Sequence, residues 1–238
     1  DERTTENQRI GGLAAEVMGG CVVSVDACTL SGSIISKSDS NAKVGGLIAV
    51  SRGEKQNGTG NSYTSADTTI KISNLQVKEE NINTNGANTT SGGLLGYQWK
   101  NTNVVFAASV DNTASESGVT ISGATLNANA QFGGLVYQAT GYWDVTAKDS
   151  IVFEGTDNTK NNFTGKSSET SPSGLLAGTG LIKVTQSENV ESALYLEAGT
   201  WGAAADAAYK INSGAVTLNI GDSKYFDELV GITKFNDA

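Results

Sequence analysis

Short apolar runs recur along the chain, and polar residues alternate with their apolar side chains. In residues 118–126 the apolar side chains are Val119, Ile121 and Leu126, with threonines and a serine between them. A period of two is typical of a half-buried β-strand, and the period of an amphipathic helix is absent there. Runs of strand length also occupy residues 21–25, 29–35, 70–77 and 103–110. The pattern predicts an all-β fold built from many short strands.

A Gly-Leu step marks the same point of a longer repeating phrase five times, and a second glycine precedes the step in the first four copies. Successive copies are 34, 47, 41 and 40 residues apart. Such a period is typical of a solenoid, in which each unit buries its apolar face against its neighbours. The repeats lie near residues 10–43, 44–90, 91–130 and 131–171. The glycines of the Gly-Leu steps are Gly12, Gly46, Gly93, Gly134 and Gly174.

These repeats predict one elongated domain over residues 1–238. Wound as coils of about 20 residues, they would place like strands about 4.8 Å apart in neighbouring coils. We therefore expect a right-handed parallel β-helix (β-solenoid) of about ten to twelve coils. The step glycines would lie at corners where two backbones approach closely, and the leucine after each glycine would point inward.

Residues 172–238 diverge from the repeating phrase. Residues 201–209 have helix propensity, and Asp222-Ser223 would cap a short helix carrying Tyr225-Phe226, Leu229 and Val230. Because the open end of a solenoid exposes unpaired strand edges, we expect these short helical or loop elements near the C-terminus to cap it.

The first repeat contains the phrases IGGL, GCVV, ACTLSGSI and VGGLI within residues 10–50. These phrases resemble the GLUG-type repeats of large bacterial surface proteins. That family combines a GGLxG stretch, a variable run, a Cys-x-apolar-x-Gly strand and a return to VGGL. The resemblance implies a β-helical segment of a secreted or wall-anchored bacterial protein, and it does not imply an enzyme. The last copy departs from the pattern, with Ser173 in place of the leading glycine.

Composition narrows the range of partners. The chain has 25 acidic and 16 basic residues and a formal net charge of −9, so it repels phosphate backbones and we expect no nucleic-acid partner. No apolar run approaches the roughly 20 residues that cross a bilayer, so we expect no membrane span. Asp1 is not an initiator methionine and no signal sequence follows it, which indicates a processed piece of a longer chain.

The absence of histidine argues against several enzyme classes. A Ser-His-Asp or Cys-His nucleophile is excluded. Parallel β-helices include polysaccharide hydrolases and lyases, and glycoside hydrolysis needs two carboxylates at one bond. Four carboxylates share one neighbourhood of the sequence: Asp144, Asp149, Glu154 and Asp157.

We therefore expect a non-enzymatic, extracellular adhesin or structural spacer with no assigned catalytic residue. The alternative is a carbohydrate-active β-helix, such as a hydrolase, a lyase or a tailspike-like depolymerase. We also expect no metal or other cofactor, because the EF-hand and RTX calcium motifs are absent.

Five aromatic residues are candidates for a ligand site. Tyr97 and Trp99 are two residues apart, hence on one strand face, and Tyr137, Tyr142 and Trp143 follow one repeat later. If this face is exposed, the rings form a platform for a host or microbial surface glycan. If it is buried, they pack in the core. A third candidate surface for a host or microbial partner protein lies in the loops at residues 52–68 and 111–118.

Cys21 and Cys28 are seven residues apart in the first repeat. This spacing does not fit a CxxC motif, and no second cysteine pair or histidine completes a zinc site. Two interpretations stay open. The thiols are free and fill the core, or they form a disulfide in an extracellular setting.

Overall fold

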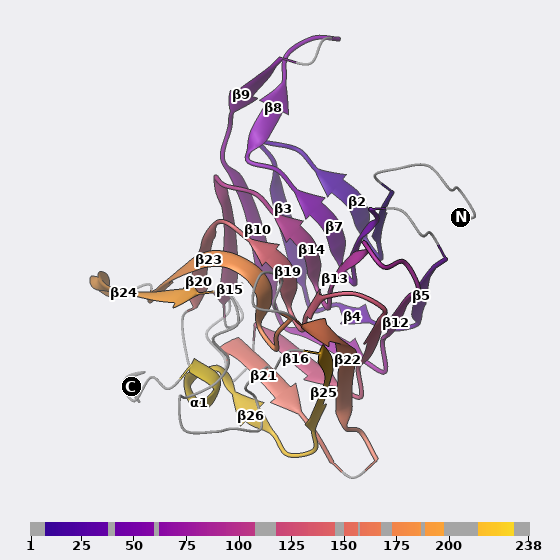
Figure 1. The fold of residues 1–238 in the computed structure, drawn as a ribbon. Helices are drawn as coiled ribbons and strands as arrows, with labels where there is room; N and C mark the ends of the chain where they lie inside the picture. Colours follow the sequence, from indigo (N-terminus) through magenta and orange to yellow (C-terminus); the bar gives the residue numbers. More distant parts are fainter. Residues whose placement is uncertain are drawn as a thin grey trace.

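The structure is a computed structural model that describes residues 8–37, 41–59, 62–107, 118–145, 150–156, 158–167, 173–186, 189–197 and 214–230. Strands make up nearly all of the regular structure, and α1 (Phe226–Val230) is the one helix within these ranges. Most strand pairs are parallel and lie in stacked sheets (Figure 1). The prediction of an all-β fold is confirmed.

The main sheets are four in number, and their strand orders follow the repeats. The first sheet runs β1 (Arg9–Gly11), β6 (Lys43–Gly45), β13 (Thr90–Gly92), β18 (Phe132–Gly133). The second runs β2 (Ala14–Val17), β7 (Ile48–Ser51), β14 (Leu95–Gln98), β19 (Val136–Ala139), β23 (Ala177–Gln186), β20 (Tyr142–Val145), β15 (Thr102–Ala107), β10 (Thr68–Ser73), β3 (Val22–Asp26).

The third and fourth sheets each contain five strands. The third runs β26 (Lys224–Tyr225), β21 (Ile151–Glu154), β16 (Val119–Ser122), β11 (Leu75–Lys78), β4 (Thr29–Leu30). The fourth runs β25 (Gly214–Ile220), β22 (Asn161–Ser167), β17 (Thr125–Ala128), β12 (Asn81–Thr84), β5 (Ser33–Ser36).

Each repeat forms one level of the stack. The first level is β1–β5, and its strands pair in parallel with β6, β7, β10, β11 and β12 of the second. The strands of the second level pair in the same way with β13–β17, which form the third level. Those strands pair in turn with β18–β22, which form the fourth. The prediction of ten to twelve coils is wrong, because one turn of the chain takes a whole repeat instead of about 20 residues.

Sharp corners divide each repeat into more strands than the apolar pattern indicates. Ala27 and Asn74, both with a φ of 48°, occupy one corner in the first and second levels. Gly32, Glu79 and Gly123 occupy the next corner, with φ values of 106°, 53° and 66°. A single residue in this left-handed region redirects the chain without a loop. The apolar run over residues 70–77 is therefore two strands.

The second glycine of each phrase lies where one level meets the next. A Cβ on Gly93 would be 1.9 Å from the carbonyl oxygen of Gly134, and Gly12 and Gly46 face the same obstacle from the level that follows each of them. In the last copy Gly174 pairs with Gly133, the leading glycine, so Leu175 holds the position of the second glycine. The sequence analysis placed Gly174 at the second glycine and Ser173 at the leading one, and both assignments are therefore wrong by one residue.

The core lies between the sheets as one cluster that extends from Val17 to Leu229. Leu47, Leu94 and Leu135, each after a step glycine, are buried in it, as expected. Leu13 differs, with 58% of its surface exposed. It belongs to the first level, whose strands pair only with the second level in the part of the chain that the structure describes.

Antiparallel strands close the other end of the stack. The outer strands β21 and β22 pair with β26 and β25, and β23 pairs with β24 (Asn189–Glu197). α1 follows β26 directly, and its Phe226 and Leu229 are buried in the core cluster. A short C-terminal helix is present as expected, but it begins at Phe226, so the expectation that Asp222-Ser223 caps it and that it carries Tyr225 is wrong. The helix expected at residues 201–209 lies outside the described residues.

A β-hairpin leaves the stack between β7 and β10. It consists of β8 (Glu54–Gln56) and β9 (Tyr63–Ser65), which, among the strands that the structure describes, pair only with each other. In Figure 1 it extends beyond the stacked sheets at the top of the view. The hairpin absorbs the extra length of the second repeat, so the 47-residue spacing from Gly45 to Gly92 leaves the pairing intact.

Candidate functional site

The structure separates the five aromatic candidates into three places. Tyr97 in β14 and Trp99 just after it are half-buried, with ring centroids 5.4 Å apart. Tyr137 in the neighbouring β19 is buried and interacts electrostatically with Tyr97. Tyr142 and Trp143 begin β20, which lies in the other half of the large second sheet. The five residues therefore do not form one platform.

Trp143 is a core residue. It is 0% exposed, and its ring packs edge-on against Phe106 with centroids 5.4 Å apart. Its Nε1 donates a hydrogen bond of 3.0 Å to Oε1 of the buried Gln98, whose Nε2 donates to the carbonyl of Thr102. This satisfies the one polar atom of the indole. The interpretation of Trp143 as part of a glycan platform is wrong, because no external ligand reaches it.

Cationic side chains lie over the rings of Tyr97 and Trp99. Nζ of Lys43 is 5.3 Å from the Tyr97 centroid, and Cζ of Arg52 is 5.0 Å from the Trp99 centroid. Such contacts are favourable cation–π interactions. A sugar stacks on a ring face, and here a cation already takes up a face of each ring. The contacts support a packing role for this pair.

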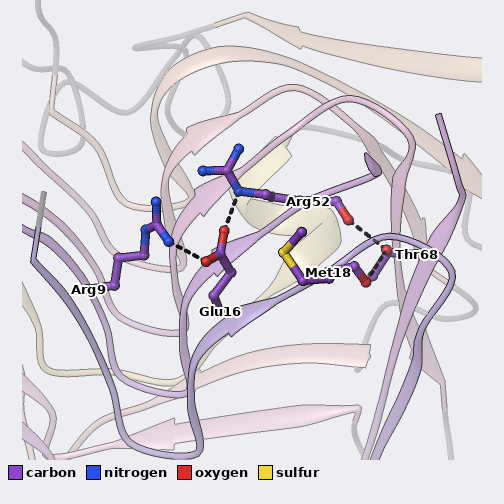
Figure 2. A network of polar contacts seen from close by, with 5 residues as sticks. All are labelled: Arg9, Glu16, Met18, Arg52 and Thr68. Atoms are coloured by element: carbon purple, nitrogen blue, oxygen red, sulfur yellow. Dashed lines mark hydrogen bonds and ion pairs between the residues drawn. The ribbon is translucent and has the colours of Figure 1, made fainter. Parts of the chain in front are cut away.

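Glu16 in β2 links two of the cationic side chains near these rings, those of Arg9 and Arg52. It accepts hydrogen bonds and ion pairs from both Arg9 and Arg52, as Figure 2 shows. Thr68 Oγ1 fixes the main chain beside it by donating to the carbonyls of Arg52 at 2.7 Å and Met18 at 3.2 Å (Figure 2). These contacts tie β1, β2 and β10 to the segment that follows β7, across two levels.

Burial and neighbouring charges shift the pKa values of Lys43, Tyr97 and Tyr137. Desolvation, followed by the nearby Arg9 and Arg52, lowers the pKa of Lys43. Burial also raises the pKa of Tyr97 and of Tyr137. Both phenols thus stay protonated at physiological pH. The chemistry available here is hydrogen bonding and packing.

A polar cleft opens on the sheet formed by β10, β15 and β20. Its volume is about 340 Å³, and its lining residues are Asp67, Thr69, Asn101, Thr102, Asn103, Tyr142 and Asp144. Thr69, Asn103 and Tyr142 are register partners on three successive levels. Asn101 fixes the rim, because its Nδ2 bonds Ser65 of the hairpin and lies 3.5 Å from the carbonyl of Gly53.

Sequence reasoning named Tyr142 and Asp144 of this cleft, and its candidate loop at residues 52–68 includes Asp67. A signal was present: Asp67-Thr68-Thr69 and Asn101-Thr102-Asn103 occupy equivalent positions 34 residues apart. The polar triplets were not recognised as a pair because the expected coils of about 20 residues did not place them on adjacent levels.

The four candidate carboxylates do not assemble as one group in the described residues. Asp144 lines the cleft, whereas Glu154 is exposed at the end of β21 in the third sheet. Asp149 and Asp157 lie outside the described residues. The second carboxylate of the cleft is Asp67, which the sequence interpretation placed in a candidate loop but did not count among the four carboxylates.

Cys21 and Cys28 are free and exposed. The thiol of Cys28 donates to the carbonyl of Asp26 at 3.1 Å. The interpretation that the thiols fill the core is therefore wrong, because both side chains face outward from the first level, whose strands pair on one side only among the described residues. In the described ranges, no three His, Cys, Asp or Glu side chains form a group that could hold a metal.

Glu80 is a carboxylate buried inside the stack. It is 4% exposed, and its Oε1 has no hydrogen-bond partner among the described residues. It lies against Gly46 and beside a small space lined by apolar side chains, among them Val77, Ile82 and Leu94. Desolvation raises the pKa of Glu80 to about 8, so the carboxyl is largely protonated at pH 7.

Comparisons with protein-family models, with curated proteins and with solved structures gave no match to this chain. Within the described part of the chain, no helix has the length and apolar character needed to cross a membrane.

Proposed function

We propose that this chain is a non-enzymatic segment of an extracellular bacterial surface protein, acting as an adhesin or a structural spacer on a right-handed parallel β-helix. The observation that supports it is the one-level-per-repeat register of the Gly-Gly-Leu phrases. Levels that contact only their neighbours build a rigid scaffold whose length follows the number of repeats. The GLUG-type resemblance of the same phrases supports the surface location.

The loops and corners of this scaffold would carry recognition. The hairpin β8–β9 pairs with none of the other described strands, and the cleft lies beside its base. Contact residues held on a rigid sheet are typical of binding proteins. The acidic surface of the chain disfavours anionic partners such as nucleic acid.

The surface assignment is tested on intact cells of the source bacterium. An antibody raised against the folded chain should label unpermeabilised cells, and brief protease treatment of those cells should remove the label. Labelling that requires permeabilisation would contradict a surface location. An antibody to a cytoplasmic protein is the control for cell integrity.

One observation favours polysaccharide cleavage as a second candidate. Asp67 and Asp144 line the same cleft, and two carboxylates at one bond are the minimum for glycoside hydrolysis. Reducing ends released from neutral and acidic polysaccharides would reveal it. Activity that Asp144→Asn abolishes would establish an enzyme, and no release from any polysaccharide supports a binding role.

A further inference from the structure

We infer that the polar cleft across β10, β15 and β20 is a binding site for a neutral saccharide. This inference deepens the proposed adhesive function and rests on it. It moves the ligand site from the Tyr97–Trp99 pair, which cations cover, to the opposite half of the second sheet.

The cleft has the size of a small-molecule site. Its volume of about 340 Å³ falls within the range of ligand pockets and far exceeds the space around a single cation. Its lining crosses three levels, and strands of adjacent levels lie about 4.8 Å apart. The floor is therefore long enough to accept at least one sugar ring.

The lining offers the mixture of groups that a sugar requires. Sugar hydroxyls both donate and accept hydrogen bonds, and Asn101, Asn103 and Thr69 supply amide and hydroxyl groups of both kinds.

Tyr142 adds an apolar surface at the edge of the cleft. It is 50% exposed, in contrast to its buried neighbour Trp143. An aromatic ring with an open surface can pack against the C–H face of a sugar while its hydroxyl stays at the polar end. Period-two alternation along β20 places Tyr142 and Asp144 on the same outer side.

Charge sets the class of saccharide. Asp67 and Asp144 both line the cleft, and none of the seven lining residues is basic. A carboxylate, sulfate or phosphate on the ligand would be repelled there. The cleft therefore selects neutral sugars over sialylated, uronic or sulfated ones.

The test is a glycan array probed with the whole chain. It carries neutral oligosaccharides ending in glucose, galactose, mannose or N-acetylglucosamine, beside sialylated and sulfated counterparts. We expect binding to a subset of the neutral glycans. Titration with the best neutral glycan should then show at least about a tenfold loss of affinity in Tyr142→Ala, and a loss in Asn103→Ala.

Two variants provide matched controls. Tyr63→Ala removes another exposed tyrosine, in the hairpin, and Tyr97→Ala removes the ring beneath Lys43. Both should bind as the unchanged chain does, and circular dichroism with thermal unfolding should show that every variant is folded.

Three results would overturn the inference: no neutral glycan binds, Tyr142→Ala and Asn103→Ala bind normally, or only anionic glycans bind. A failure of the cleft is separable from a failure of the proposed function. Surface labelling without glycan binding would leave the chain a surface spacer, whereas glycan binding by a chain found only inside cells would overturn the surface assignment.

Discussion

At the residue scale, whether the second position of a Gly-Gly-Leu phrase can hold a side chain depends on whether the backbone of a further level packs against it. Gly93 lies under the carbonyl of Gly134, whereas Leu175, at the equivalent position of the last copy, is a large side chain. The need for glycine thus comes from the neighbouring backbone, because the residue's own φ is not in the left-handed region.

Gly93→Ala should destabilise the fold strongly. The added Cβ meets backbone that is paired on both sides, so the cost should exceed the 1–3 kcal/mol typical of overpacking, at roughly 3 kcal/mol or more. Urea denaturation measures it. Gly221→Ala is the matched control, because its Cβ would meet only the flexible end of Lys160, and equal losses in the two variants would contradict the explanation.

Glu80 makes stability depend on pH. Its pKa is raised from 4.5 to about 8 in the folded state, so between these values the folded protein holds a proton that the unfolded chain has released. The free energy of unfolding therefore falls as the pH rises through this window and levels off above it. The total change is on the order of 4 to 5 kcal/mol.

Glu80→Gln should remove this dependence. The variant and the unchanged chain should have similar stability near pH 4.5, and the variant should become the more stable of the two as the pH approaches 8. Chemical denaturation across that range provides the measurement. Parallel curves for the chain with and without Glu80 would contradict the prediction.

At the scale of elements, the C-terminal strands cover edges that would otherwise be open. β25 and β26 pair antiparallel with β22 and β21, and α1 buries Phe226 and Leu229 beside them. Unpaired parallel edges are templates for association with other chains. The antiparallel direction ends the repeat, because no further parallel level can be added to these two strands.

Truncation after residue 197 removes β25, β26 and α1 and should expose those edges. We expect self-association and increased binding of a hydrophobic dye, seen by light scattering and fluorescence. Truncation after residue 230 keeps all three elements and serves as the control. A monomeric, stable product of the shorter truncation would show that these elements are not a cap.

The sequence was sufficient for the strands and the repeat, and insufficient for the turns between them. Period-two alternation shows that Tyr142 and Trp143 point to opposite sides, yet it does not say which side is the core. The corner at Asn74 depends on a positive φ, which the surrounding apolar run conceals. The cleft depends on residues one level apart, so it could not be assembled while the length of a level was wrong.

At the scale of the whole molecule, register is set by the glycine phrases and is independent of the number of residues between them. Gly11, Gly45, Gly92 and Gly133 are aligned although their spacings are unequal. The added length leaves the stack as the hairpin β8–β9. Insertions in this hairpin should therefore cost only loop entropy, which grows slowly with length.

An insertion of six Gly and Ser residues between Asn57 and Gly58 should lower the thermal unfolding midpoint by no more than about 2 °C. The same insertion between Gly45 and Gly46 interrupts the close contact between levels and should prevent folding. Differential scanning fluorimetry of the two variants makes the comparison, and equal effects at the two sites would contradict a register set by the phrases.

The nearest-neighbour pairing of levels also has a consequence for synthesis of the chain. Each parallel pair joins residues one repeat apart, so every new level pairs with the level that precedes it in the sequence. A nascent chain emerging from the ribosome can thus add each level to a completed one. Folding time should then grow in proportion to the number of repeats, because the loop closed at each step stays one repeat long.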